Sequence, residues 1–148
     1  AKFRAAPDSA AQLEAAAVLF GADRYADAQK QFQSFLTEAA GGSLAATAKL
    51  GIAACQEAQG QLDAALASYR EVTTGFKDTT DAMAAKFSMG RILELQGKPA
   101  DAVTSYKEVA QSQLAGSLAS EAANRIALIQ VKLAAQKPAT AATPATKS

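Results

Sequence analysis

Apolar residues recur at intervals of three and four along most of this chain, which is the spacing that places side chains on one face of an α-helix. Ala65, Tyr69 and Val72 show the pattern clearly. Stretches of this kind are separated by short segments that contain Gly, Ser, Thr or Asp. We therefore predict helices near residues 8–21, 25–39, 43–59, 62–74, 80–96, 99–113 and 117–135.

The apolar pattern also repeats along the chain. Equivalent positions lie 37 residues apart (65 − 28 = 37), and the copies align without a gap. The aligned sets include Ala28, Ala65 and Ala102; Phe32, Tyr69 and Tyr106; and Val18, Cys55, Ile92 and Ile129. Each unit reads as two helices, so the chain is expected to be an array of helical repeats.

The ends of the predicted helices carry suitable residues. Gly60 and Gly97 follow the first helix of their units, where a left-handed residue commonly ends a helix, and Asp23 takes that place in the first unit. Pro99 fits the first turn of the next helix, because its missing amide would be unpaired there anyway. Hydroxyl residues of one phase are expected to be N-caps, namely Ser43, Thr80 and Ser117.

These features predict an all-α fold of three helix pairs followed by a capping helix. The expected repeat domain covers residues 8–136, with repeats at about 8–42, 43–79 and 80–116 and the capping helix at 117–136. Residues 1–7 form an N-terminal extension. Residues 137–148 carry two Pro and no large apolar side chain. That composition predicts a flexible Ala/Thr/Pro tail.

Composition excludes several kinds of catalytic and metal site. The chain has no His and only one Cys, so a His-dependent triad, a His-containing zinc site and an intramolecular disulfide are excluded. Cys55 shares an apolar phase, so we expect a buried structural thiol rather than a reactive one. Glu57 and Glu94 occupy equivalent positions but have no evident nucleophile beside them. We expect no enzymatic activity, no cofactor and no metal.

Charge and hydropathy also limit the partners. The net charge is +1 and the basic residues are scattered, so no nucleic-acid footprint stands out. The longest apolar run, from Ala15 to Ala22, is far too short to span a bilayer. We therefore expect no direct membrane insertion of this segment.

The repeat pattern resembles the tetratricopeptide repeat (TPR) family. The matching positions are Ala53, Gly60, Leu62, Ala65 and Tyr69; then Gly90, Gly97, Ala102 and Tyr106; and in the first copy Ala16, Tyr25, Ala28 and Phe32. The period of 37 residues is longer than the usual 34 or so, and the family's large aromatic early in the first helix and its closing Pro are absent. Units of this length resemble divergent bacterial TPR domains of cell-envelope proteins, among them the YfgM-like domains. The resemblance implies a right-handed solenoid.

The resemblance also implies a binding surface on the concave face, along the first helix of each pair. Carried onto this chain, the candidate protein-binding residues are Leu13, Phe20, Leu50, Glu57, Phe87, Arg91, Glu94, Asn124 and Leu128. They are mostly apolar and lack the Lys/Asn cluster with which some TPR domains hold a C-terminal carboxylate. A hydrophobic or amphipathic segment is the expected guest, with Arg91 and Glu94 setting its orientation.

Two functions from different classes follow. The first is a non-catalytic scaffold that binds a peptide or protein segment in a bacterial envelope or secretion-related assembly. Under this hypothesis a periplasmic or membrane-anchored location is favoured over a cytoplasmic one. The alternative is a self-association module, in which an exposed Phe20–Leu50–Phe87 strip builds a homo-oligomer.

Overall fold

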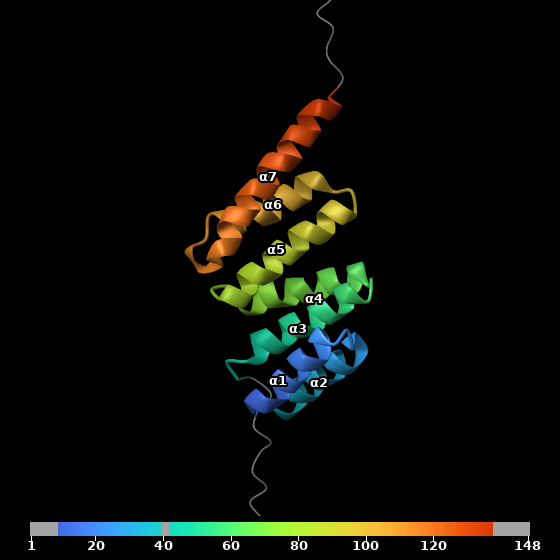
Figure 1. The fold of residues 1–148 in the computed structure, drawn as a ribbon. Coiled ribbons are helices and arrows are strands. Elements are labelled where there is room, and N and C mark those ends of the chain that lie inside the picture. Colours follow the sequence, from blue (N-terminus) through green and yellow to red (C-terminus); the bar gives the residue numbers. More distant parts are fainter. Residues whose placement is uncertain (1–8, 40–41, 138–148) are drawn as a thin grey trace, which may run out of the picture.

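The computed structural model describes residues 9–39 and 42–137, which form a row of antiparallel helix pairs (Figure 1). The helices are α1 (Ser9–Gly21), α2 (Tyr25–Glu38), α3 (Ala45–Ala58), α4 (Leu62–Gly75), α5 (Thr80–Leu95), α6 (Pro99–Ala110) and α7 (Ser117–Gln136), with a short 3-10 turn, η1 (Gln113–Ala115), before α7. Each helix packs on its neighbours in sequence, and the first helices of successive pairs also touch one another. The all-α solenoid of three pairs and a final helix is confirmed.

The turn inside each pair uses a left-handed residue. Gly60 and Gly97 have φ values of 76° and 70°, and Asp23 has a φ of 59° at the equivalent position. The short side chain of Asp23 tolerates this conformation, and its carboxylate accepts a 2.7 Å hydrogen bond from the Tyr25 hydroxyl. The prediction that Asp23 replaces the turn glycine is therefore confirmed.

The predicted N-caps are wrong. The cap of α5 is Thr79, whose hydroxyl accepts a 3.1 Å hydrogen bond from the amide of Ala82, rather than Thr80. The residues one period either side of Thr79 are Gly42 and Gly116. Glycine has no side chain that could accept a hydrogen bond from the amides of the first turn. Neither α3, which begins at Ala45, nor α7 therefore has a side-chain cap.

The end of α6 also differs from the prediction. The helix stops at Ala110 rather than near residue 113, and the Ser112 hydroxyl accepts a 3.2 Å hydrogen bond from the amide of Leu114 at the start of η1. After this turn α7 packs on α6 and α5, as expected of a capping helix. Its last turns extend beyond α6 (Figure 1).

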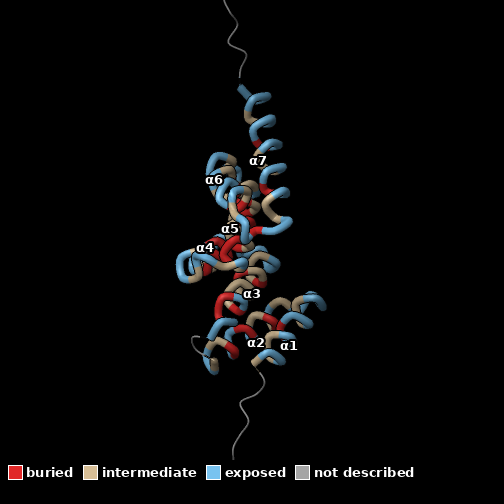
Figure 2. The backbone as a smooth tube through the Cα atoms, turned by 90° about the vertical axis from the view of Figure 1, so that its left-hand side faces the viewer, coloured by how far each residue is buried: buried red, intermediate tan, exposed pale blue. Residues whose placement is uncertain are grey.

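The core lies between the helices as two apolar clusters that meet at α3 (Figure 2). Ala48 and Cys55 face α1 and α2, whereas Ala53 belongs to the larger cluster that extends to α7. Val18 departs from its phase, because it is 66% exposed while Cys55 and Ile92 are fully buried. No earlier helix pair among the described residues covers that side of α1.

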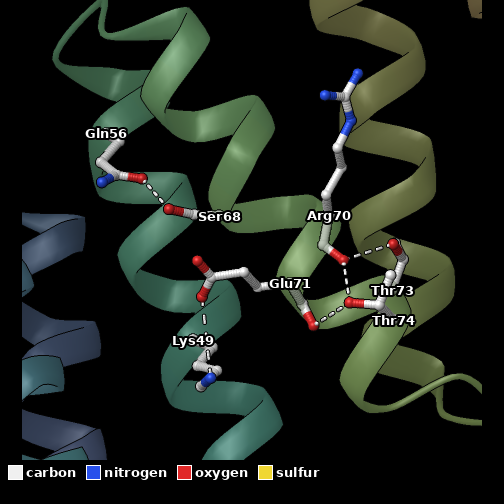
Figure 3. Close-up of polar contacts among 7 residues, drawn as sticks. All are labelled: Lys49, Gln56, Ser68, Arg70, Glu71, Thr73 and Thr74. Atoms are coloured by element: carbon white, nitrogen blue, oxygen red, sulfur yellow. Dashed lines mark hydrogen bonds and ion pairs between the residues drawn. The ribbon is translucent and has the colours of Figure 1, made fainter.

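Polar contacts join the two helices of a pair outside the core (Figure 3). In the second pair, the Ser68 hydroxyl of α4 donates a 2.6 Å hydrogen bond to Gln56 of α3. Glu71 of α4 lies 3.9 Å from the ammonium group of Lys49 of α3. These contacts join α3 to α4 at the surface of the second pair.

Two of the predicted segments, the extension at 1–7 and all but Lys137 of the tail at 137–148, lie outside the described residues. Within residues 9–39 and 42–137, none of the helices combines the length and hydropathy that crossing a membrane requires.

Candidate functional site

The first helices α1, α3 and α5 line a groove that contains two adjoining cavities. The smaller has a volume of about 300 Å³ and lies over α1 and α3. Its lining residues are Leu13, Ala17, Phe20, Phe32, Thr47, Leu50, Gly51 and Ala54. The larger, of about 420 Å³, shares Phe20, Leu50 and Ala54 with the first and continues toward α5. Its other lining residues are Glu57, Ala58, Tyr69, Ala84, Ser88 and Arg91.

The smaller cavity is walled almost wholly by apolar groups. Phe32 of α2 reaches through to α3, and its ring lies so close to Gly51 that a Cβ there would sit 2.5 Å from it. Phe20 forms an edge-on contact with Tyr25, with ring centroids 5.1 Å apart. Since Thr47 is the sole polar side chain of the lining, the cavity suits a large apolar group.

The larger cavity has a polar wall built from three helices. Glu57 of α3 accepts a 2.8 Å hydrogen bond from the Tyr69 hydroxyl of α4 and a 2.5 Å charge-assisted bond from Arg91 of α5. The carboxylate therefore links one helix pair to the next. We call this arrangement the Tyr–Glu–Arg network.

A second copy of the network lies one repeat further on. The Tyr106 hydroxyl of α6 donates a 2.7 Å hydrogen bond to Glu94 of α5, and the guanidinium group of Arg125 of α7 is 3.7 Å from the same carboxylate oxygen. Arg125 is one period beyond Ser88 and not beyond Arg91, so the arginine comes from a different turn of the helix.

The tyrosines of both networks have raised pKa values. Burial first, and then the hydrogen bond to Glu57, raise the pKa of Tyr69 above its ordinary value, and burial and Glu94 do the same to the pKa of Tyr106. Both hydroxyls therefore remain donors to their carboxylates at physiological pH.

Cys55 carries no reactive thiol. It is fully buried, and burial raises its pKa to about 11. The prediction of a buried structural thiol is confirmed. Within the described residues 9–39 and 42–137, no cluster of acidic or Cys side chains is suited to hold a metal ion.

The nine predicted site residues fall into three groups. Those that line the two adjoining cavities are Leu13, Phe20, Leu50, Glu57 and Arg91. Those on the later first helices with solvent contact are Glu94, Asn124 and Leu128. Glu94 lines a separate cavity of about 340 Å³ between the α5–α6 turn and α7.

Phe87 forms a group of its own and corrects the predicted exposed strip. It is only 7% exposed and packs on Tyr106, with ring centroids 5.3 Å apart. Tyr106 in turn lies against the backbone of Gly90, where earlier repeats have Ala. Phe87 therefore contributes to the core, and the proposed strip ends at Leu50.

Sequence reasoning missed Phe32, Gly51, Tyr69 and Ser88 as residues of the groove, and Arg125 as a partner of Glu94. One signal for the network was visible along the repeats. The phase that holds Glu57 and Glu94 holds Phe20 in the first copy, and the phase that holds Tyr69 and Tyr106 holds Phe32. The first copy lacks both the carboxylate and the hydroxyl, and this joint absence indicates that the two groups bind each other where they are present.

Comparison with solved structures supports the fold. SycD, the type III secretion translocator chaperone of Yersinia enterocolitica, superimposes with a TM-score of 0.70 at 22% identity, covering 84% of this chain and 93% of SycD. SycD bound to a peptide of the translocator YopD gives the same TM-score and identity, with 88% and 98% coverage. PcrH in complex with the chaperone-binding region of PopD gives a TM-score of 0.70 at 21% identity, with 85% and 94% coverage. No curated protein matches the chain.

These neighbours contradict the expected location. We favoured a periplasmic or membrane-anchored envelope domain, whereas the similar solved structures include the type III secretion chaperone SycD and PcrH bound to the chaperone-binding region of PopD. The envelope placement is therefore wrong as judged by these neighbours, and we withdraw it.

The family follows from a separate comparison. A family model described as a tetratricopeptide repeat-like domain matches residues 5–141, which is nearly the whole chain. The match covers all seven helices and both networks. The chain belongs to the tetratricopeptide repeat-like domain family.

Proposed function

We propose that this protein is a non-catalytic scaffold that binds a peptide or protein segment in the groove along its first helices, as part of a secretion-related assembly. The observation that carries the proposal is the pair of adjoining cavities, one apolar and one with a polar wall, lined by consecutive first helices. Together they run over α1, α3 and α5. Solved neighbours of this fold hold translocator segments, which supports the same use here.

The absence of catalysis is part of the proposal. Glu57 and Glu94 are already bound by a tyrosine and an arginine each, so neither carboxylate is free to act as a general base. Cys55 is buried away from the groove. Binding of a segment is the use that these fixed side chains support.

A second candidate is self-association, favoured by the apolar side chains that α7 exposes. Leu128 and Val131 are 58% and 67% exposed. Sedimentation velocity over a wide concentration range separates the two functions. A stable dimer lost on Leu128→Glu substitution supports self-association. A monomer at about 100 µM, where a dimer with a dissociation constant of about 1 µM would be almost fully formed, contradicts it.

The experiment for the groove is selection of peptides from a displayed random library on the intact chain, followed by fluorescence anisotropy. Ala17 is exposed and lines the apolar cavity, so Ala17→Glu places a charge there without disturbing the core. We expect this variant to weaken binding at least about tenfold, a difference of about 1.4 kcal/mol.

Leu114→Glu is the matched control, because Leu114 is 44% exposed and lies in η1 away from the cavities. Both variants should keep the wild-type melting temperature. Failure to select any binding peptide, or equal binding by the Ala17→Glu variant, contradicts the proposed function.

A further inference from the structure

The chemistry of the groove changes from α1 to α7. From this change we propose that the bound segment carries an apolar residue at each end and an acidic residue between them. The inference rests on the proposed function, since it describes the occupant of the same groove. It is carried by three neighbouring regions whose side chains differ in kind.

The first region is the apolar cavity over α1 and α3. Leu13, Phe20 and Leu50 form its walls, and Gly51 leaves room for the Phe32 ring. A polar side chain placed there would lose its water and find almost no partner, which is unfavourable. This region therefore takes a large apolar side chain, such as Phe or Leu.

The second region is the row of Tyr–Glu–Arg networks on α3, α5 and α7. The side chain of Arg91 is 43% exposed, whereas its partner Glu57 is 16% exposed. Arg125 and Glu94 differ in the same direction, at 40% and 21%. Both carboxylates also accept from a buried tyrosine hydroxyl, so a guest meets guanidinium groups rather than free carboxylates.

A guanidinium group has five N–H donors, and the ion pair with a glutamate leaves some of them available. An acidic side chain of the guest would bind these donors by charge-assisted hydrogen bonds. A lysine at the same place would face the exposed guanidinium group of Arg91 and be repelled. The middle of the groove therefore selects an acidic residue by charge complementarity.

The third region is the exposed part of α7. Leu128 is one period beyond Arg91, and Val131 is one period beyond Glu94. Earlier members of these phases line the groove, namely Ala54 and Arg91 in one phase and Phe20 and Glu57 in the other, so α7 continues the same row with apolar side chains. Because Leu128 and Val131 are 58% and 67% exposed, a second apolar residue of the guest can cover them.

The distance between the apolar regions fixes the spacing of the guest. Packed helices lie roughly 8–10 Å apart, so about 20 Å separates the α1–α3 cavity from α7. An extended chain covers this distance in about six residues. An extended guest is also favoured because the arginines can donate to its unpaired backbone carbonyl groups, whereas a helix has satisfied its own.

The test uses the intact chain and a fluorescein-labelled peptide of about 12 residues, long enough to span the groove. It carries Phe and Leu about six residues apart with Glu midway, on a Ser/Thr background. Matched peptides replace Glu by Lys, Phe by Ser, or Leu by Ser. We expect the Glu→Lys change to weaken binding at least about tenfold at low salt and less at high salt, because salt screens the charges.

A double-mutant cycle tests the α7 end. Leu128→Ser should weaken binding of the parent peptide about fivefold and leave the Leu→Ser peptide unaffected, since that peptide has no residue to place there. The melting curve of Leu128→Ser should match the wild type, because the side chain is exposed.

Two outcomes would overturn the inference while leaving the proposed function intact. They are binding that depends on Ala17 but is equal for the Glu and Lys peptides, and binding that ignores Leu128. Loss of the Ala17 dependence itself would contradict the proposed function instead. The two failures are thus distinguishable within one set of titrations.

Discussion

The first junction of the solenoid lies between its first and second helix pairs, and the second junction lies between its second and third pairs. The same aromatic position of the repeat makes an apolar contact at the first junction and belongs to a polar network at the second. At the first, Phe32 of α2 packs on Gly51 of α3 and forms a wall of an apolar cavity. At the second, Tyr69 of α4 donates to Glu57, which also binds Arg91 of α5. The backbone follows the same repeat in both places, yet the first junction is apolar and the second is polar.

The difference teaches that the network positions must change as a set. A buried tyrosine hydroxyl needs an acceptor, and a half-buried carboxylate needs donors, because unpaired polar groups are unfavourable away from water. The first junction lacks the hydroxyl, the carboxylate and the arginine together, with Phe32, Phe20 and Ala54 in their phases. This coordinated loss lets one fold carry two surface chemistries along a single groove.

The largest predicted contrast is between Tyr106→Ala and Phe32→Ala. Each removes a buried ring, at about 3–5 kcal/mol. Tyr106 is fully buried and its removal also leaves Glu94 without its hydroxyl donor, so we expect a loss near about 5 kcal/mol against about 3 kcal/mol for Phe32. Urea denaturation monitored by circular dichroism measures both. Equal losses would show that the hydroxyl contributes nothing beyond its ring.

A smaller effect is expected from Tyr69→Phe, which turns the second junction toward the first. The ring remains, but Glu57 loses a hydrogen bond to a charged group, at roughly 2 kcal/mol. The matched variant Phe32→Tyr adds a hydroxyl beside apolar Phe20 and should also destabilise. If Phe32→Tyr were neutral, the requirement that the positions change together would be wrong.

The sequence predicted the helices and turns of the molecule better than the side chains that line its groove. Helix spacing, the left-handed turn at Asp23 and the small residues between helices depend on neighbours in the chain, so a period of 37 reveals them. The N-caps failed because their phase is occupied by Gly42, Thr79 and Gly116, and only one of these has a side chain. The predicted cap positions therefore lay one residue after the position that Thr79 occupies.

The geometry of the networks could not be predicted for a different reason. Glu57, Tyr69 and Arg91 lie on three helices, and which rotamer meets which depends on the packing of all three. Phe87 shows the same limit, since it packs on Tyr106 and is buried, whereas its phase mate Leu50 lines the groove. The position of a residue in the repeat does not by itself determine its exposure.

A third prediction concerns the apolar cavity itself. A Cβ on Gly51 would lie 2.5 Å from the end of the Phe32 ring. The ring can shift toward the open cavity, so Gly51→Ala should destabilise by only about 1 kcal/mol, the lower end for overpacking. It should also reduce the space for a guest and weaken peptide binding.

The matched control for Gly51→Ala is Gly21→Ala, because nothing lies within 4 Å of a Cβ there. This control should be neutral or slightly stabilising and should leave binding unchanged. Isothermal titration and thermal melting of the two variants give both quantities. Unchanged binding by Gly51→Ala would argue that the cavity does not hold the guest.

The smallest expected difference appears at alkaline pH. The pKa values of Tyr69 and Tyr106 are raised by burial and by their carboxylate partners, while an unfolded tyrosine ionises near pH 10. Because the folded pKa is the higher one, the contribution is fully present below about pH 10 and is lost as the pH rises further.

At about pH 10.5 the loss should be under about 1 kcal/mol for each tyrosine. Phe32, at the apolar first junction, cannot ionise. Replacing Tyr69 by Phe should therefore make the contribution of the second junction to stability as insensitive to alkaline pH as that of the first. Stability at about pH 9.5 and 10.5 should therefore fall less in Tyr69→Phe than in the wild type. Cys55, whose pKa burial raises to about 11, contributes equally to both proteins and cancels in the difference. Equal falls would mean that the Tyr69 hydroxyl ionises as freely in the folded chain as in the unfolded one, contrary to its place in the network.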